Sequence, residues 1–328
     1  MSIGAHDGSS GRPSVTAEPV QSSAPGKIIL FGEHAVVYGE PAIAVPVTEV
    51  EAEASVVPAP GGHGLTLVAA DLGESFPLGD APPGDPLAMA AQLTLDLLGV
   101  PPPDARLTVR STIPIASGLG SGAAVSTALV RALARFLGHA LEPADVSALV
   151  YAVEKIHHGT PSGIDNTVIA YEKPVYFVRE ARVGPSPLSV GAPFRLLIGD
   201  TGLPSPTRRL VDRVRARREE DRAGCDAILE QIGSVARRGR RAIEEGRVGD
   251  LGPLMTENHR LLVELGVSSP ALDALVNAAC STGATGSKLS GAGQGGNMLA
   301  LAPPGAEGPV TRALRDAGAV RVIETTVS

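Results

Sequence analysis

The sequence predicts two α+β domains, and three observations lead to this fold class. Its 328 residues are enough to build two packed domains, or one large domain, with a sizeable core. Hydrophobic residues make up 43% of the chain and charged residues 19%, which is typical of a globular protein. Strand-like and helix-like segments occur in both halves without strict β-α-β alternation, which favours α+β domains.

Two stretches of unusual composition set the expected limits of the domains. Residues 1–22 lack the charged and apolar regions of a secretory signal, so we expect a disordered leader there. Gly, Pro and Ser cluster again between residues 182 and 193, which indicates a domain boundary. We therefore expect an N-terminal domain over residues 23–185 and a C-terminal domain over residues 193–328.

In the N-terminal half, apolar segments bounded by turn residues predict strands. These segments cover residues 27–31, 42–57, 65–69, 107–111 and 174–178. Apolar residues at a spacing of three to four predict helices between them. The helices cover residues 86–98, 121–137 and 143–157.

The C-terminal half contains the same two kinds of pattern. The predicted strands cover residues 194–198, 284–289, 297–302 and 320–325. Helical patterns separated by glycines fill residues 207–245, and two further helices are predicted over residues 271–279 and 310–317.

Charge and composition exclude several classes of function. The net charge is −7, so no overall positive field would attract nucleic acid, and with 3% aromatic residues the chain has few rings for stacking bases. No apolar run is long enough to span a membrane, and we expect a cytoplasmic protein. Cys225 and Cys280 lie far apart without metal-ligand spacing, so we expect two buried, reduced thiols.

A glycine-rich segment, GLGSGAA at residues 118–124, lies between a predicted strand and a long helix. Glycines let a ligand approach the backbone closely, and the start of a helix offers unpaired N–H groups and a positive dipole end. The segment therefore predicts a cradle for phosphates, although a tight turn without a ligand would need the same residues. It is not a P-loop, because no lysine follows it.

A second glycine-rich segment, GAGQGG at residues 291–296, lies between two predicted strands. A plain hairpin needs fewer glycines, so we expect a loop that faces phosphate or substrate. Lys288, just before it, either adds positive charge to this loop or lies on the surface.

Two further segments carry candidate catalytic residues. Lys27 begins an apolar strand although lysine is rarely buried without a partner, so it is either functional or a surface residue of an edge strand. Glu33 and His34 form a polar pair beside a glycine, which either contacts a small polar ligand or has a structural role. Asp165 follows a turn rich in Pro and Gly, where it is either an N-cap or a general base paired with a lysine. Glu154 could supply oxygen to Mg²⁺.

These four elements, in this order, resemble the GHMP kinase superfamily over the chain from about residue 22 to its end. Within the superfamily, the strings KIILFGEHAVVYG and HHGTPSGIDN are most similar to those of members that phosphorylate mevalonate. The resemblance implies an N-terminal ribosomal-protein-S5-like domain and a C-terminal ferredoxin-like domain with the active site between them. It also implies ATP, Mg²⁺ and mevalonate as ligands, and it is compatible with a homodimer.

The resemblance also implies a role for each matching residue. The catalytic residues would be Asp165 and Lys27. The residues expected to bind ATP are Pro114, Ala116, Ser117, Gly118, Leu119, Gly120, Ser121, Gly122, Ala123 and Ala124. The residues expected to bind the substrate are Lys27, Glu33, His34, Ser162, Gly163, Asp165, Thr207, Gly291, Ala292 and Gly293. The expected metal ligands are Glu154 and Ser121.

The chain departs from the family pattern at two positions. Gly122 stands where many members have the second of two serines, so Ser121 or water would have to bind the metal in its place. Gln294 stands where glycine is frequent. Two other functions stay open: a sister enzyme acting on phosphomevalonate or homoserine, and a nucleotide-binding regulator without activity.

Overall fold

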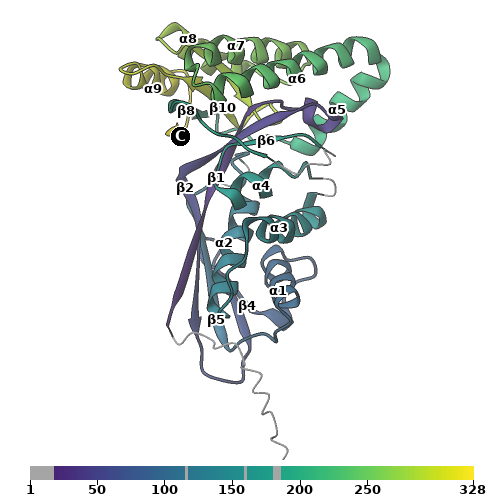
Figure 1. Ribbon diagram of the computed structural model, residues 1–328, viewed down its shortest axis with the longest axis vertical. Helices are drawn as coiled ribbons and strands as arrows, with labels where there is room; N and C mark the ends of the chain where they lie inside the picture. The colour runs from purple at the N-terminus through teal and green to yellow at the C-terminus, as the bar shows by residue number, and fades with distance from the viewer. Residues whose placement is uncertain (1–17, 115–116, 159–160, 180–185) are drawn as a thin grey trace, which may run out of the picture.

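The computed structural model describes residues 18–114, 117–158, 161–179 and 186–328, and in them the chain folds around two sheets. The first sheet and its helices form what we call the N-terminal lobe, and the second sheet and its helices form the C-terminal lobe. Figure 1 shows the long strands of the first sheet running along the molecule, with the helices of the C-terminal lobe gathered at one end. No helix in the described residues is long and apolar enough to cross a membrane.

The sheet of the N-terminal lobe has seven strands in the order β4-β3-β5-β2-β6-β7, with β1 paired to β2 beside this path. The strands are β1 (Val20–Phe31), β2 (Ala42–Pro58), β3 (Leu65–Ala69), β4 (Glu74–Pro77), β5 (Ala105–Ser111), β6 (Val175–Phe177) and β7 (Ser186–Pro187). A short 3₁₀ helix, η1 (Ala35–Tyr38), connects β1 to β2, and η2 (Leu78–Asp80) follows β4. All strand pairs are antiparallel except β3 and β5.

The N-terminal lobe has four helices: α1 (Pro86–Leu98), α2 (Ser121–Phe136), α3 (Pro143–His158) and α4 (Ile164–Tyr171). Helices α2 and α4 pack on the sheet, and α1 and α3 pack against α2. Helix α2 lies at the centre of the lobe, since it contacts β1, β2 and the three other helices. Its buried side is rich in alanine, which lets the neighbouring elements approach closely in a protein with few aromatic side chains. The central position of α2 places its first turn, and the glycine-rich loop before it, beside β1.

The C-terminal lobe has an antiparallel sheet in the order β11-β8-β10-β9, covered by helices. Its strands are β8 (Phe194–Asp200), β9 (Gly286–Ser290), β10 (Asn297–Leu301) and β11 (Arg321–Val327). Its helices are α5 (Thr207–Glu220), α6 (Arg222–Glu244), α7 (Val248–Glu264), α8 (Pro270–Ser281) and α9 (Glu307–Asp316). Both lobes mix strands and helices, so the predicted α+β class is confirmed. Both cysteines are free, but only Cys225 is buried as expected; Cys280, near the end of α8, is exposed.

Two elements differ from the sequence prediction. Strand β1 begins at Val20, opposite Val56 of β2, whereas we expected the strand to begin at Lys27. Helix α7 was not predicted, because Gly252 and Pro253 in its sequence are typical of a loop. Gly252 is needed there: a Cβ at this position would lie 2.5 Å from the backbone oxygen of Thr285, so α7 packs directly on the chain entering β9.

Candidate active site

The centre of the candidate site is an ion pair between the two predicted catalytic residues. The Nζ atom of Lys27, on β1, lies 3.0 Å from Oδ1 of Asp165. The lysine side chain is 6% exposed and the aspartate side chain 30% exposed, so the carboxylate is the member of the pair that a ligand can reach. Asp165 lies in the first turn of α4, whose N-cap is Gly163, so the interpretation of Asp165 as an N-cap is wrong.

The first glycine-rich loop passes directly over this lysine. The backbone N–H of Lys27 donates a hydrogen bond of 2.9 Å to the carbonyl oxygen of Leu119. Gly118 and Gly120 have φ angles of +83° and +76°, and α2 begins at the next residue, Ser121. The free N–H groups of the first turn of α2, and its positive dipole end, therefore lie next to the ion pair.

We expect Gly120→Ala to lower kcat by about tenfold or more, because a Cβ at this position would lie 3.0 Å from Cγ of Lys27 and displace the lysine. Gly118→Ala is the matched control, since its φ is also positive but no atom lies within 4 Å of its Cβ position. Both variants carry backbone strain of about 1–2 kcal/mol, so they differ in the contacts that a Cβ at Gly120 would make, with Lys27 and with Ile169 at 3.0 Å. Equal kcat values in the two variants, measured by steady-state kinetics, would contradict this prediction.

Glu154, on α3, completes a group of charged side chains at the start of α2. A Cβ at Gly122 would lie 3.7 Å from Oε1 of Glu154, so this carboxylate faces the first turn of α2. Burial, and next the nearby Asp165 carboxylate, raise the pKa of Glu154 to about 7, and the charge of Lys27 acts in the opposite direction. The absence of a side chain at Gly122 leaves the space in front of Glu154 open.

On the other side of Lys27, the turn after β1 carries Glu33 and His34. His34 has a φ of +59°, and its Nε2 donates a hydrogen bond of 2.9 Å to the carbonyl oxygen of Ala292. Burial lowers the pKa of His34. This contact joins the turn to the second glycine-rich loop, which belongs to the C-terminal lobe.

The carboxylate of Glu33 is held by two side chains of the C-terminal lobe. One oxygen pairs with Nζ of Lys288 on β9, and the other accepts a hydrogen bond of 3.2 Å from Nδ2 of Asn258 on α7. The side chains of Lys288 and Glu33 are 0% and 1% exposed, so of the two alternatives for Lys288 the surface position is wrong. Lys288 does place a positive charge next to the second glycine-rich loop, but this charge is paired with the Glu33 carboxylate rather than with a ligand.

The second glycine-rich loop, residues 291–296, connects several predicted residues. The carbonyl oxygen of Gly293 accepts a hydrogen bond of 2.8 Å from the Ser205 hydroxyl, two residues before Thr207 at the start of α5. Just after the loop, Nδ2 of Asn297 donates a hydrogen bond of 2.6 Å to the carbonyl oxygen of Ser117. The loop therefore contacts the substrate-side turn at one end and the first glycine-rich loop at the other.

The structure also places the remaining predicted residues. Pro114 and Ser117 adjoin the first loop, where the Ser117 hydroxyl donates to the Pro114 carbonyl oxygen at 2.8 Å. Ala116 lies outside the described residues. Ala123 and Ala124 are buried in the first turn of α2, and Ser162 accepts a hydrogen bond from the backbone of Ile164 at the start of α4.

Sequence reasoning missed Asn258 and Asn297, which connect parts of the site across the two lobes. Asn258 lies on the unpredicted α7, so no periodicity drew attention to it. The signal that could have shown the cross-lobe contact is Lys288 itself, a lysine inside a strand that is buried along its whole length.

Two α+β lobes with a lysine–aspartate pair under a glycine-rich helix start define a GHMP kinase. The GHMP kinases N terminal domain matches residues 87–173, and the GHMP kinases C terminal domain matches residues 240–320. The chain is 35% identical to a mevalonate kinase of Pyrococcus horikoshii over 93% of this chain and 94% of that protein. It is 34% identical to a mevalonate kinase of Aeropyrum pernix over 90% of this chain and 91% of that protein.

Two solved structures have the same fold. The L. major mevalonate kinase in complex with R-mevalonate superposes with a TM-score of 0.81 at 28% identity, over 95% of this chain and 99% of that chain. The Methanococcus jannaschii mevalonate kinase superposes with a TM-score of 0.80 at 26% identity, over 96% of this chain and 99% of that chain. The chain belongs to the GHMP kinase family and, within it, to the mevalonate kinases.

Proposed function

We propose that the chain transfers the γ-phosphoryl group of ATP to the C5 hydroxyl of (R)-mevalonate, giving 5-phosphomevalonate and ADP. The observation that carries this proposal is the ion pair of Lys27 and Asp165 beside the first turn of α2. It joins a group that can accept a proton to a cation and to a phosphate cradle, which are the parts that phosphoryl transfer needs.

Each of these residues has a defined part in the reaction. Asp165 accepts or orients the proton of the C5 hydroxyl as its oxygen bonds to the γ-phosphorus and the bond to the β-phosphate oxygen breaks. Lys27 stabilises the negative charge that develops on the attacking oxygen. The N–H groups of residues 118–124 bind the phosphates of ATP.

The acid substrate would lie between the turn after β1 and the second glycine-rich loop. His34, the backbone of residues 291–293 and Thr207 border this region, and Ser162 and Gly163 precede Asp165 on the other side. Glu33 supports His34 through its contacts with the C-terminal lobe rather than by offering a free carboxylate.

The residues present fit a Mg²⁺ ion that is bound together with the nucleotide. Glu154 provides a carboxylate whose raised pKa reflects burial and a neighbouring negative charge, and a cation would relieve both effects. Ser121, directly before Gly122 in the sequence, provides a hydroxyl oxygen. No group of three His, Cys, Asp or Glu side chains suited to a metal occurs in the described residues, so phosphate oxygens and water would have to complete the coordination. When bound, the ion neutralises charge on the phosphates.

We expect the carboxyl group of Glu154 to titrate near pH 7 in the free protein, as its pKa of about 7 indicates. A ¹³C NMR titration would measure this midpoint, and a Mg²⁺–nucleotide analogue should lower it by at least about one unit, because the cation binds the ionised form. Affinity for the complex should therefore rise between about pH 6 and 8. Glu154→Gln is the control and should remove this dependence, and a midpoint that the complex does not move would contradict the assignment.

The function is tested by measuring ADP release with ATP, Mg²⁺ and each of four acceptors: mevalonate, phosphomevalonate, homoserine and galactose. Turnover with mevalonate alone is the expected result. Turnover with another acceptor would keep the kinase class and overturn the substrate. ATP binding without turnover on any acceptor would favour a regulatory protein.

A further inference from the structure

Gln294 occupies a backbone conformation that favours glycine. Its φ angle is +60°, in the left-handed region, and it stands between two glycines in the loop of residues 291–296. A glycine would adopt this conformation without strain, and a glutamine does not. The glutamine side chain makes a contact that a glycine would lack.

The contact is with the turn between α7 and α8. Nε2 of Gln294 donates a hydrogen bond of 2.7 Å to the carbonyl oxygen of Ser268, and its backbone N–H donates one of 2.9 Å to the carbonyl oxygen of Val267. The neighbouring Gly293 leaves no room for a side chain, since a Cβ there would lie 2.0 Å from the oxygen of Val267. The loop is thus fastened to this turn by both backbone and side chain.

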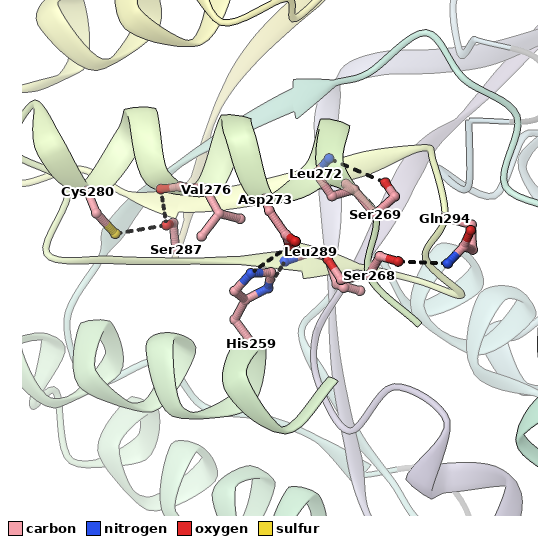
Figure 2. A network of polar contacts seen from close by, with 10 residues as sticks. All are labelled: His259, Ser268, Ser269, Leu272, Asp273, Val276, Cys280, Ser287, Leu289 and Gln294. Atoms are coloured by element: carbon pink, nitrogen blue, oxygen red, sulfur yellow. Dashed lines mark hydrogen bonds and ion pairs between the residues drawn. The ribbon is translucent and has the colours of Figure 1, made fainter. Parts of the chain in front are cut away.

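The turn that receives Gln294 is itself held in place, as Figure 2 shows. The Ser268 hydroxyl donates to Asp273 of α8, and Nε2 of His259, on α7, lies 3.3 Å from the same carboxylate oxygen. Nδ1 of His259 accepts a hydrogen bond of 3.2 Å from the backbone N–H of Leu289 on β9. Three elements of the C-terminal lobe therefore fix the point to which Gln294 binds.

The two residues before Gln294 contact the substrate side of the candidate site. The carbonyl oxygen of Ala292 accepts from His34, and that of Gly293 accepts from Ser205. The contact with the first glycine-rich loop is made instead by Asn297, which donates to Ser117. Asn297 already belongs to strand β10, so the Gln294 side chain does not hold it in place. Displacement of the loop at residue 294 would therefore disturb its contacts with His34 and Ser205 more than the contact between Asn297 and Ser117.

We infer that Gln294 is a positioning residue for the acid substrate: its side chain holds the carbonyl groups of Ala292 and Gly293 where they orient His34 and Ser205. The inference rests on the proposed function for the identity of the acid. It assigns to this glutamine a part in acid binding and none in ATP binding.

Two variants test the inference. Gln294→Glu keeps the length of the side chain but removes the donor, and Gln294→Gly removes the donor while relieving the backbone. Gln231→Glu is the matched control, because Nε2 of the exposed Gln231 also donates to a backbone oxygen, that of Ala227, on the surface of α6. The loss of one hydrogen bond predicts a KM for mevalonate that rises about three- to tenfold in both Gln294 variants, with the KM for ATP unchanged within about twofold.

The outcomes separate this inference from the proposed function. Equal increases in both KM values would show general loosening, and an unchanged KM for mevalonate in Gln294→Gly would show that the contact is idle; either result overturns the inference. Amide hydrogen exchange provides a second readout that needs no turnover: residues 291–294 should exchange faster in both variants and not in the control. Unchanged exchange overturns the inference, whereas absence of wild-type turnover on mevalonate overturns only the proposed function.

Discussion

Asp165→Asn is expected to lower kcat by at least about a hundredfold, with the midpoint of thermal unfolding changed by no more than a few degrees. The amide has the same shape as the carboxylate and can still accept a hydrogen bond from Lys27, 3.0 Å away in the ion pair, but it cannot take the proton of the acceptor hydroxyl. Steady-state measurement of ADP release gives kcat, and calorimetry gives the unfolding midpoint.

Asp145→Asn is the matched control for this change. Asp145 also lies in the first turn of a helix, α3, but its side chain is exposed. It is not one of the residues that form the candidate site. It should keep the wild-type kcat. If Asp165→Asn retained a kcat within about tenfold of the wild type, Asp165 would not be the proton acceptor, and phosphoryl transfer here would depend on positioning alone.

The largest expected effect on stability is that of Lys288→Met, which should lower the free energy of unfolding by about 3–5 kcal/mol. The substitution leaves the buried Glu33 carboxylate without its cation, and Asn258 alone cannot balance the charge. Burial lowers the pKa of Lys288, and the negative charge of Glu33 opposes this shift. The charged form of the lysine is therefore stabilised by Glu33, just as the carboxylate is stabilised by the lysine. Urea unfolding of the free protein measures the change.

A double variant separates the charge effect from the loss of packing. Glu33→Gln combined with Lys288→Met removes both charges and should recover more than half of the lost stability. Lys173→Met, at an exposed lysine, should stay within about 0.5 kcal/mol of the wild type. A double variant as unstable as Lys288→Met would show that packing around the lysine stem, rather than the stranded carboxylate, determines the cost.

Most elements with clear periodicity could be predicted from the sequence. The helix predicted over residues 121–137 is α2, Ser121–Phe136, because its apolar residues and the glycines before it agree on where it begins. The start of β1 could not be predicted, since Val20–Ser22 are stabilised by pairing with β2 and not by an apolar pattern of their own. Helix α7 was hidden because close packing against β9 requires glycine where helix propensity disfavours it.

In the candidate site, too, some contacts could be predicted from the sequence and others could not. The pairing of Lys27 with Asp165 was implied by the resemblance to the GHMP kinases, while the residues alone indicated only that a buried lysine would need a partner. The pair of Lys288 with Glu33 was not expected, since 255 positions separate the two residues and only the docking of the lobes brings them together. Contacts that depend on the relative placement of two sheets leave little trace in local sequence.

The buried pair of Lys288 and Glu33 also adds to the contacts that hold the two lobes together. Separating the lobes at Glu33 breaks this ion pair and the hydrogen bond from Asn258, whereas separating them at Asn297 and Ser117 breaks one neutral hydrogen bond, worth about 1 kcal/mol. The contact between Asn297 and Ser117 is therefore the easier of the two to break.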